Sequence, residues 1–146
     1  AAANIEGLAR VTAAVQLPIM ADESVWTAED ARRLVEAGAC DLLNIKLAKT
    51  GGLRGALAIA EVARAAGVEC MLGAMMEPRI SITAAAHLAI AHPAITMIDL
   101  DPPAWFASDA PAGGYVQDGA WLRLTGGPGL GLARLGADDD PAGGDR

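Results

Sequence analysis

Short apolar runs recur along this chain at intervals of about 25 residues and are separated by segments with helical periodicity. This alternation predicts parallel strands, because right-handed crossovers through a helix join strands that run in one direction. The expected strands cover residues 17–21, 41–46, 68–73 and 94–99. The expected helices cover residues 4–15, 27–38, 53–66 and 81–92. The predicted fold class is therefore α/β, with four parallel β/α units.

Residues that begin and end helices support these bounds. Asn4 is a suitable N-cap for the first helix, and Thr27 with Asp30 three residues later is close to a capping box. Gly38 and Gly67 stand where the next two helices should end, a position that favours glycine. The predicted elements are thus short and joined by tight loops.

The pattern changes after residue 101. Prolines and glycines interrupt the following part, whose strand-like stretches are residues 114–117 and 121–124. Residues 133–146 are rich in aspartate and glycine and hold too few apolar side chains for a core, so we expect disorder there. The predicted domain therefore spans residues 1–132 and ends in an irregular closing segment.

Charged side chains stand at the carboxyl ends of the expected strands. Asp22 and Lys46 end the first two, Glu77 lies just past the third, and Asp99 and Asp101 close the fourth. Parallel strands present their carboxyl ends at one edge of a sheet, and strand alternation turns Asp22, Lys46 and Asp99 toward one face. This repeated pattern predicts an active site at that edge.

Each of these side chains suits a particular chemistry, and each also has a purely structural interpretation. A desolvated Lys46 can serve as a base near neutral pH, or it is an edge lysine paired with a carboxylate. Asp22 is a suitable Mg²⁺ ligand, or an acid that favours a helix start. Asp99 and Asp101 form an anionic patch that suits an ammonium group, or they are acids at a loop start. Only the combination points to an active site.

Two architectures place active residues at the carboxyl ends of parallel strands, an open doubly wound sheet and a (β/α)8 barrel. A dinucleotide-binding sheet needs a glycine-rich turn after its first strand. This chain has the sequence ADES at residues 21–24 instead, whose two acids repel a pyrophosphate. A complete barrel needs about 250 residues. The 146 residues of this chain suffice for one half of a barrel.

Composition narrows the possible partners. The net charge is −7 and lysine and arginine do not cluster, which argues against nucleic acid binding. No apolar stretch reaches the roughly 18 residues that cross a bilayer, and no signal segment is recognisable, so we expect no membrane partner and a cytoplasmic location. Hydrophobic residues make up 53% of the chain, enough for a core. Cys40 and Cys70 lack metal-ligand spacing and are expected to be buried, reduced thiols.

Several of these segments together resemble the muconate-lactonizing subgroup of the enolase superfamily. The similar stretches are residues 18–24 (PIMADES), 44–52 (NIKLAKTGG) and 71–77 (MLGAMME), in this order and at this spacing. Within the subgroup, residues 98–101 (IDLD) are similar to the Asp-x-Asp signature of the dipeptide epimerases. The resemblance extends over about residues 5–132.

That family has an N-terminal capping domain and a (β/α)7β barrel. The resemblance implies that this chain supplies barrel strands five to eight and the closing segment, without the capping domain or the first half of the barrel. It implies that Asp22 is a Mg²⁺ ligand and that Lys46 is a catalytic lysine. It also implies that Asp99 and Asp101 bind the α-ammonium group of the substrate and that Glu77 belongs to the substrate wall.

The implied reaction is metal-dependent epimerisation of dipeptides of the L-Ala-D/L-Glu type, by removal of the α-proton through an enediolate. The family's second base and its other two metal ligands have no counterpart here, so we expect the isolated chain to be inactive. The full-length enzyme is expected to bind a small-molecule dipeptide and to form a homo-oligomer. Alternatives are a cycloisomerase, an o-succinylbenzoate synthase or an N-acylamino acid racemase of the same subgroup, or a non-catalytic half-barrel.

Overall fold

The computed structural model describes residues 4–101, 106–107 and 111–133. Its centre is a parallel sheet of four strands, β1 (Met20–Ala21), β2 (Leu42–Lys46), β3 (Glu69–Gly73) and β4 (Ile95–Asp99). The strands lie in the order β1-β2-β3-β4, so neighbours in the sheet are also neighbours in the sequence. A doubly wound sheet reverses its order at a switch point, whereas these strands advance in one direction, as in a barrel wall. The predicted α/β class with parallel strands is confirmed.

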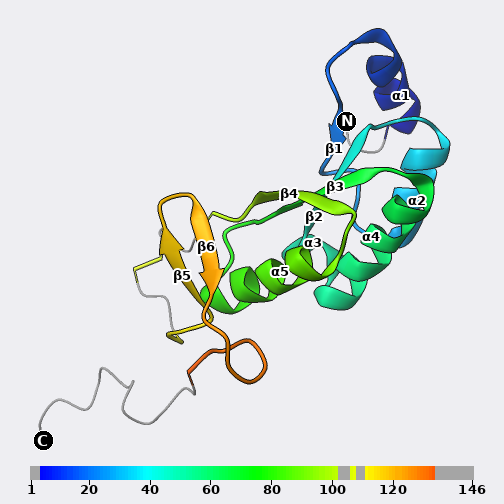
Figure 1. Cartoon of the computed structure of the whole chain (residues 1–146). Helices are drawn as coiled ribbons and strands as arrows, with labels where there is room; N and C mark the ends of the chain where they lie inside the picture. Colours follow the sequence, from blue (N-terminus) through cyan, green and yellow to red (C-terminus); the bar gives the residue numbers. More distant parts are fainter. Residues whose placement is uncertain (1–3, 102–105, 108–110, 134–146) are drawn as a thin grey trace, which may run out of the picture.

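Helices cover one face of this sheet. This layer consists of α2 (Ala28–Glu36), α4 (Leu53–Ala66) and α5 (Arg79–Ala91), whereas the single turn α3 (Leu47–Thr50) follows the end of β2 and α1 (Ile5–Ala14) lies beyond the β1 edge. Figure 1 shows α2, α4 and α5 on the same side of the strands. The core between the two layers contains Leu34, Leu43, Ile45, Ile59 and Leu72, all fully buried. Burial of each such side chain contributes roughly 1.5–3 kcal/mol.

Local capping explains where the helices begin and end. Thr27 Oγ1 accepts a hydrogen bond from the Asp30 N–H (3.1 Å), and the Asp30 carboxylate accepts one from the Thr27 N–H (2.9 Å), which completes the predicted capping box of α2. Asn4 caps α1 by accepting from the Gly7 N–H (2.8 Å). Gly67 ends α4 with a φ of 70°, a left-handed conformation that favours glycine. These helix signals in the sequence are confirmed.

The first strand is shorter than the pattern predicts. An extended segment is expected from residue 17, but ladder pairing is limited to Met20–Ala21. The strand lies at the sheet edge and Pro18 has no N–H to donate, so the ladder cannot extend through it. The segment is held instead by the Asp41 carboxylate, which accepts a hydrogen bond from the Ile19 N–H (2.7 Å).

The short helix α3 is not predicted from the sequence. It begins directly after the last residue of β2, and the Gly52 N–H closes its turn on the Leu47 carbonyl (2.9 Å). Four residues are too few for an independent helix, because the free energy lost in nucleating a helix exceeds the stabilisation from the hydrogen bonds of one turn. The surrounding structure must therefore stabilise α3.

The closing segment forms an antiparallel hairpin of β5 (Tyr115–Asp118) and β6 (Trp121–Leu124). Arg79, in the first turn of α5, attaches the hairpin to this helix. Figure 1 shows the hairpin beside the same end of α5. The guanidinium lies 4.3 Å from the centroid of the Tyr115 ring, and its Nη1 donates to the carbonyl oxygens of Gly113 and Tyr115 (both 3.1 Å). Both strand-like stretches are thus confirmed, and the structure adds how they pair and where they attach.

Both cysteines are buried and free. Burial raises the pKa of the Cys40 thiol to about 11 and that of the Cys70 thiol to about 12, so both are protonated and unreactive at neutral pH. No helix in the described part of the chain is long and apolar enough to cross a membrane. The disorder expected over residues 133–146 lies, apart from Ala133, outside the described residues.

Candidate active site

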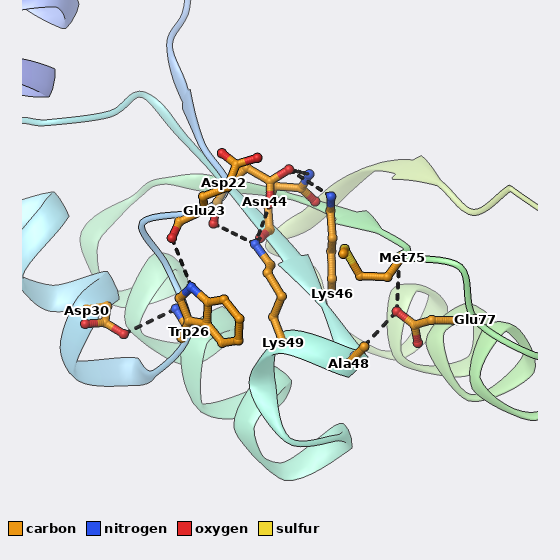
Figure 2. Close-up of polar contacts among 10 residues, drawn as sticks. All are labelled: Asp22, Glu23, Trp26, Asp30, Asn44, Lys46, Ala48, Lys49, Met75 and Glu77. Carbon is orange, nitrogen blue, oxygen red and sulfur yellow. Dashed lines mark hydrogen bonds and ion pairs between the residues drawn. The ribbon is translucent and has the colours of Figure 1, made fainter. Parts of the chain in front are cut away.

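The edge of the sheet at which β1 and β2 end brings two predicted site residues into contact. Asp22 follows β1 directly, and Lys46 is the last residue of β2. Lys46 Nζ lies 2.9 Å from Asp22 Oδ2, and 16% and 25% of these two side chains are exposed, respectively (Figure 2). The predicted convergence of these two strand ends is confirmed.

A second lysine, Lys49 of α3, also binds Asp22. Its Nζ donates to Asp22 Oδ1, to the Asp22 backbone carbonyl (2.6 Å) and to the Asn44 backbone carbonyl (3.3 Å). Only 5% of the Lys49 side chain is exposed, and these acceptors replace the water that its ammonium group loses. Sequence reasoning missed this residue. The available signal was its place three residues after Lys46, which a helical turn directs back over the strand end.

Asn44 completes the contacts of the carboxylate. It is a buried residue of β2, and its Nδ2 donates to Asp22 Oδ2 (3.0 Å). A flipped amide would place Asn44 Oδ1 next to the Asp22 carboxylate, and two acceptors cannot form a hydrogen bond, so this orientation is assigned. Its Oδ1 has no hydrogen-bond partner within the described part of the chain and lies where a Cβ on Gly73 would come within 2.6 Å. Asn44 and Lys46 therefore hold one oxygen of Asp22, and Lys49 holds the other.

These contacts determine the charge of Asp22. Burial raises the pKa of its carboxyl group, but the hydrogen bonds and charges of Lys49 and Lys46 lower it by more. The resulting pKa lies below the usual value of 3.8. Asp22 is therefore ionised at neutral pH, as a metal ligand must be.

The other predicted binding residues lie farther across the sheet. Asp99 ends β4 and pairs with Gly73 of β3, which in turn pairs with Lys46. Adjacent strands lie about 4.8 Å apart, so the backbones of Asp99 and Lys46 are separated by about 10 Å. Asp99 and Asp101 are exposed and line a cavity of about 230 Å³ together with Gln117 and other residues of the hairpin. The hairpin thus forms one wall beside the acid pair.

Glu77 makes contacts within the protein. It is buried, and its Oε1 accepts hydrogen bonds from the backbone N–H groups of Met75 (3.1 Å) and Ala48 (3.4 Å), as Figure 2 shows. Its Oε2 accepts a hydrogen bond from the Ser81 hydroxyl. These bonds tie the loop after β3 to the first turn of α3. A place in the substrate wall stays a prediction for this residue.

A hollow of about 560 Å³ lies beside Asp22, lined by α1, by β1 and by residues 22–24. An ionised, partly exposed carboxylate is the kind of ligand that Mg²⁺ prefers. The residues that the structure describes contain no group of three His, Cys, Asp or Glu side chains that could hold a metal ion. Asp22 therefore fits Mg²⁺ as one ligand of a site that further groups must complete.

Comparison with known proteins agrees with this geometry. Residues 1–134 match the family described as "Enolase C-terminal domain-like". The chain belongs to this family. An L-Ala-D/L-Glu epimerase from Clostridium acetobutylicum is 51% identical to it over 129 residues, which are 88% of this chain and 36% of that protein.

Solved structures of this enolase-like family superpose well on the chain. The substrate-liganded L-Ala-D/L-Glu epimerase from Bacillus subtilis has a TM-score of 0.86 and 44% identity, and the match covers 90% of this chain and 37% of that one. The dipeptide epimerase from Cytophaga hutchinsonii, complexed with Mg and the dipeptide D-Ala-L-Val, has a TM-score of 0.85 and 36% identity, covering 91% and 36%. The chain spans little more than a third of the length of these relatives.

Proposed function

We propose that this chain is the C-terminal part of a Mg²⁺-dependent dipeptide epimerase, in which its parallel strands are strands five to eight of a (β/α)7β barrel. The observation that carries the proposal is the contact between Lys46 and Asp22 at the carboxyl edge of an enolase-like sheet. The names of the similar proteins, L-Ala-D/L-Glu epimerase and dipeptide epimerase, support the choice of substrate. Residues 1–132 then belong to the barrel of a longer protein, called the full-length protein below.

Lys46 exchanges the α-proton in this proposal. Its Nζ stands at the end of β2, where the partly exposed side chain can turn from Asp22 Oδ2 toward a substrate carbon. It removes a proton from one face of that carbon or returns one to it, while a base outside this chain serves the other face. The α-proton beside the substrate carboxylate is only weakly acidic. Mg²⁺ bound to Asp22 would stabilise the negative charge that develops on the substrate carboxylate when this proton is removed.

Asp99 and Asp101 select the substrate. Their exposed carboxylates line the cavity beside the hairpin, and a carboxylate pair favours an ammonium group through charge-assisted hydrogen bonds. A dipeptide carries a free α-ammonium group, whereas N-acylated amino acids and cycloisomerase substrates carry none. The acid pair is therefore the feature that favours a dipeptide over the substrates of the other enzymes in the subgroup.

The decisive experiment replaces Lys46 in the full-length protein. We expect Lys46→Met to abolish epimerisation and, in D₂O, to abolish α-deuteration on one substrate face while the other face still exchanges. Arg64→Met is the matched control, because it likewise replaces a cation by methionine but on the exposed surface of α4, and it should leave the parent rate. Full exchange on both faces in Lys46→Met would disprove the assignment.

Asp99→Asn tests the substrate class. Loss of one carboxylate from the pair should raise the KM for a dipeptide at least about tenfold, which corresponds to roughly 1.4 kcal/mol. The KM for an N-acetylated analogue should not change. An equal loss for both compounds would show that Asp99 does not bind the ammonium group.

The gene sequence upstream of Ala1 offers the simplest check. The proposal requires a second catalytic lysine and two further metal-binding carboxylates at the ends of successive strands, because Lys46 and Asp22 supply only one base and one ligand. An upstream reading frame without them would favour a non-catalytic half-barrel.

A further inference from the structure

Lys49 has no part in the mechanism above, yet it makes the most extensive contacts with Asp22. Its ammonium group bonds both the side-chain Oδ1 and the backbone carbonyl of this residue (2.6 Å to the carbonyl). One donor that holds the backbone and the side chain of the same residue fixes the torsion angles between them. Lys46 and Asn44 both reach the other carboxylate oxygen, at 2.9 and 3.0 Å.

We propose that Lys49 is a positioning residue for Asp22: it holds Oδ1, so that Oδ2, which Lys46 and Asn44 contact, is the oxygen left to a divalent cation once Lys46 turns to the substrate. The inference rests on the proposed function, because it takes Asp22 as a metal ligand. Lys49 acts only through Asp22 and has no contact with the substrate.

The two lysines differ in burial and in the contacts that hold them, as this division of roles requires. Lys49 lies on α3, and a hydrogen bond supports each end of this helix. The Glu77 carboxylate accepts from the Ala48 N–H (3.4 Å), and the Thr50 hydroxyl donates to the Gly52 carbonyl (3.2 Å). The Lys49 side chain is 5% exposed, against 16% for Lys46. Figure 2 shows both lysines at Asp22; in the proposed mechanism the more buried Lys49 stays there, while Lys46 turns to the substrate.

Metal affinity distinguishes positioning from simple charge compensation, because the two roles predict changes of opposite sign. A cation that only neutralises Asp22 competes with the metal, so its removal would tighten Mg²⁺ binding. A cation that orients Asp22 improves the site, so its removal weakens binding. Replacing a residue that hydrogen-bonds to a metal ligand typically lowers the metal affinity by about 10- to 100-fold.

The test uses Lys49→Met in the full-length protein. We expect calorimetry to show an increase of about 10- to 100-fold in the Mg²⁺ dissociation constant. The kcat should fall more than the KM rises, and a crystal structure should show the Asp22 carboxylate rotated or disordered. Lys46→Met is the contrasting variant, since it should be inactive but bind Mg²⁺ at least as tightly as the parent, with the Asp22 carboxylate still held by Lys49.

A conservative variant keeps the inference testable if Lys49→Met does not fold. Lys49→Arg retains the charge, but a planar guanidinium cannot reproduce the contacts of a compact ammonium group. We expect its Mg²⁺ dissociation constant to lie between those of the parent and Lys49→Met. An unchanged or lower constant in the variant that folds, with Asp22 in its original orientation, overturns the inference. A parent protein that binds Mg²⁺ but does not epimerise dipeptides overturns only the proposed reaction.

Discussion

Asp22 is the residue on which the contacts of the site converge. Lys46 and Asn44 come from β2 and Lys49 comes from α3, and each donates to its carboxylate. Because these donors share one acceptor group, removing any of them changes the charge and the hydrogen bonds that act on the others. Effects of substitutions in this cluster should therefore not be additive.

Gly73→Ala tests this coupling from a neighbouring strand. A Cβ on Gly73 would lie 2.6 Å from Asn44 Oδ1, so the asparagine must move and its bond to Asp22 weakens. We expect a loss of about 1–3 kcal/mol in the free energy of unfolding, measured by urea denaturation. In an Asn44→Ala background the same change should cost clearly less, because the clash is gone. Equal costs in both backgrounds would contradict the coupling.

Among the secondary-structure elements, α3 depends most on its surroundings. Its four residues carry Lys49, and it packs against the start of α4, where Gly55 approaches it closely. A Cβ on Gly55 would lie 1.9 Å from the Thr50 carbonyl oxygen. The absence of a side chain at Gly55 is therefore what allows the two helices to meet.

Gly55→Ala should destabilise the protein although it lies within a helix. Alanine normally stabilises a helix relative to glycine by about 1 kcal/mol, but here α4 must move away from α3, which costs about 1–3 kcal/mol or more. Thermal or urea unfolding gives the sign. Ala58→Gly, at an exposed position of the same helix, is the control and should show the ordinary loss of about 1 kcal/mol. A stabilised Gly55→Ala variant would contradict the close approach.

At the scale of the whole molecule, the two faces of the sheet are unequal. Helices α2, α4 and α5 cover one face, and the site residues lie at the edge of the other (Figures 1 and 2). The edge strands β1 and β4 each have one partner in the described sheet. Open edges of this kind favour pairing with a further strand. This asymmetry is consistent with a chain that forms part of a larger barrel.

Acid should destabilise the chain through two carboxylates. Burial raises the pKa of Asp22 and Asp30, but the lysines at Asp22 and the hydrogen bonds from Thr27 and Trp26 at Asp30 lower it by more. Each folded-state pKa thus lies below the unfolded value of about 3.9. The stabilisation is present above this pH and is lost as the pH falls through the folded-state values. Urea denaturation between pH 7 and pH 2 should show this decline.

The double variant Asp22→Asn/Asp30→Asn serves as the control for the acid effect. It should be less stable than the parent at pH 7, because the ion pairs and the capping box are weakened. Its free energy of unfolding should then fall less steeply in acid. An identical decline in parent and variant would assign the acid sensitivity to other groups.

Local sequence patterns were enough to predict the main strands and helices and the charged residues at the strand ends, but not α3. Helical and strand periodicity, the capping pair Thr27 and Asp30, and the stop at Gly67 act between near neighbours, so they are visible in one dimension. The approach of Asp22 and Lys46 was also predictable, because parallel strands of known alternation leave little choice of where their ends point.

The surroundings of these strand ends depend on contacts between residues far apart in the sequence. Lys49 reaches Asp22 across 27 residues, Glu77 reaches Ala48 across 29, and Arg79 anchors the hairpin at Tyr115 across 36. Such contacts depend on where each connection between strands places the next element in space. The local sequence pattern does not contain this information. The short helix α3 exists for the same reason, since one turn is stable only where the fold supports it.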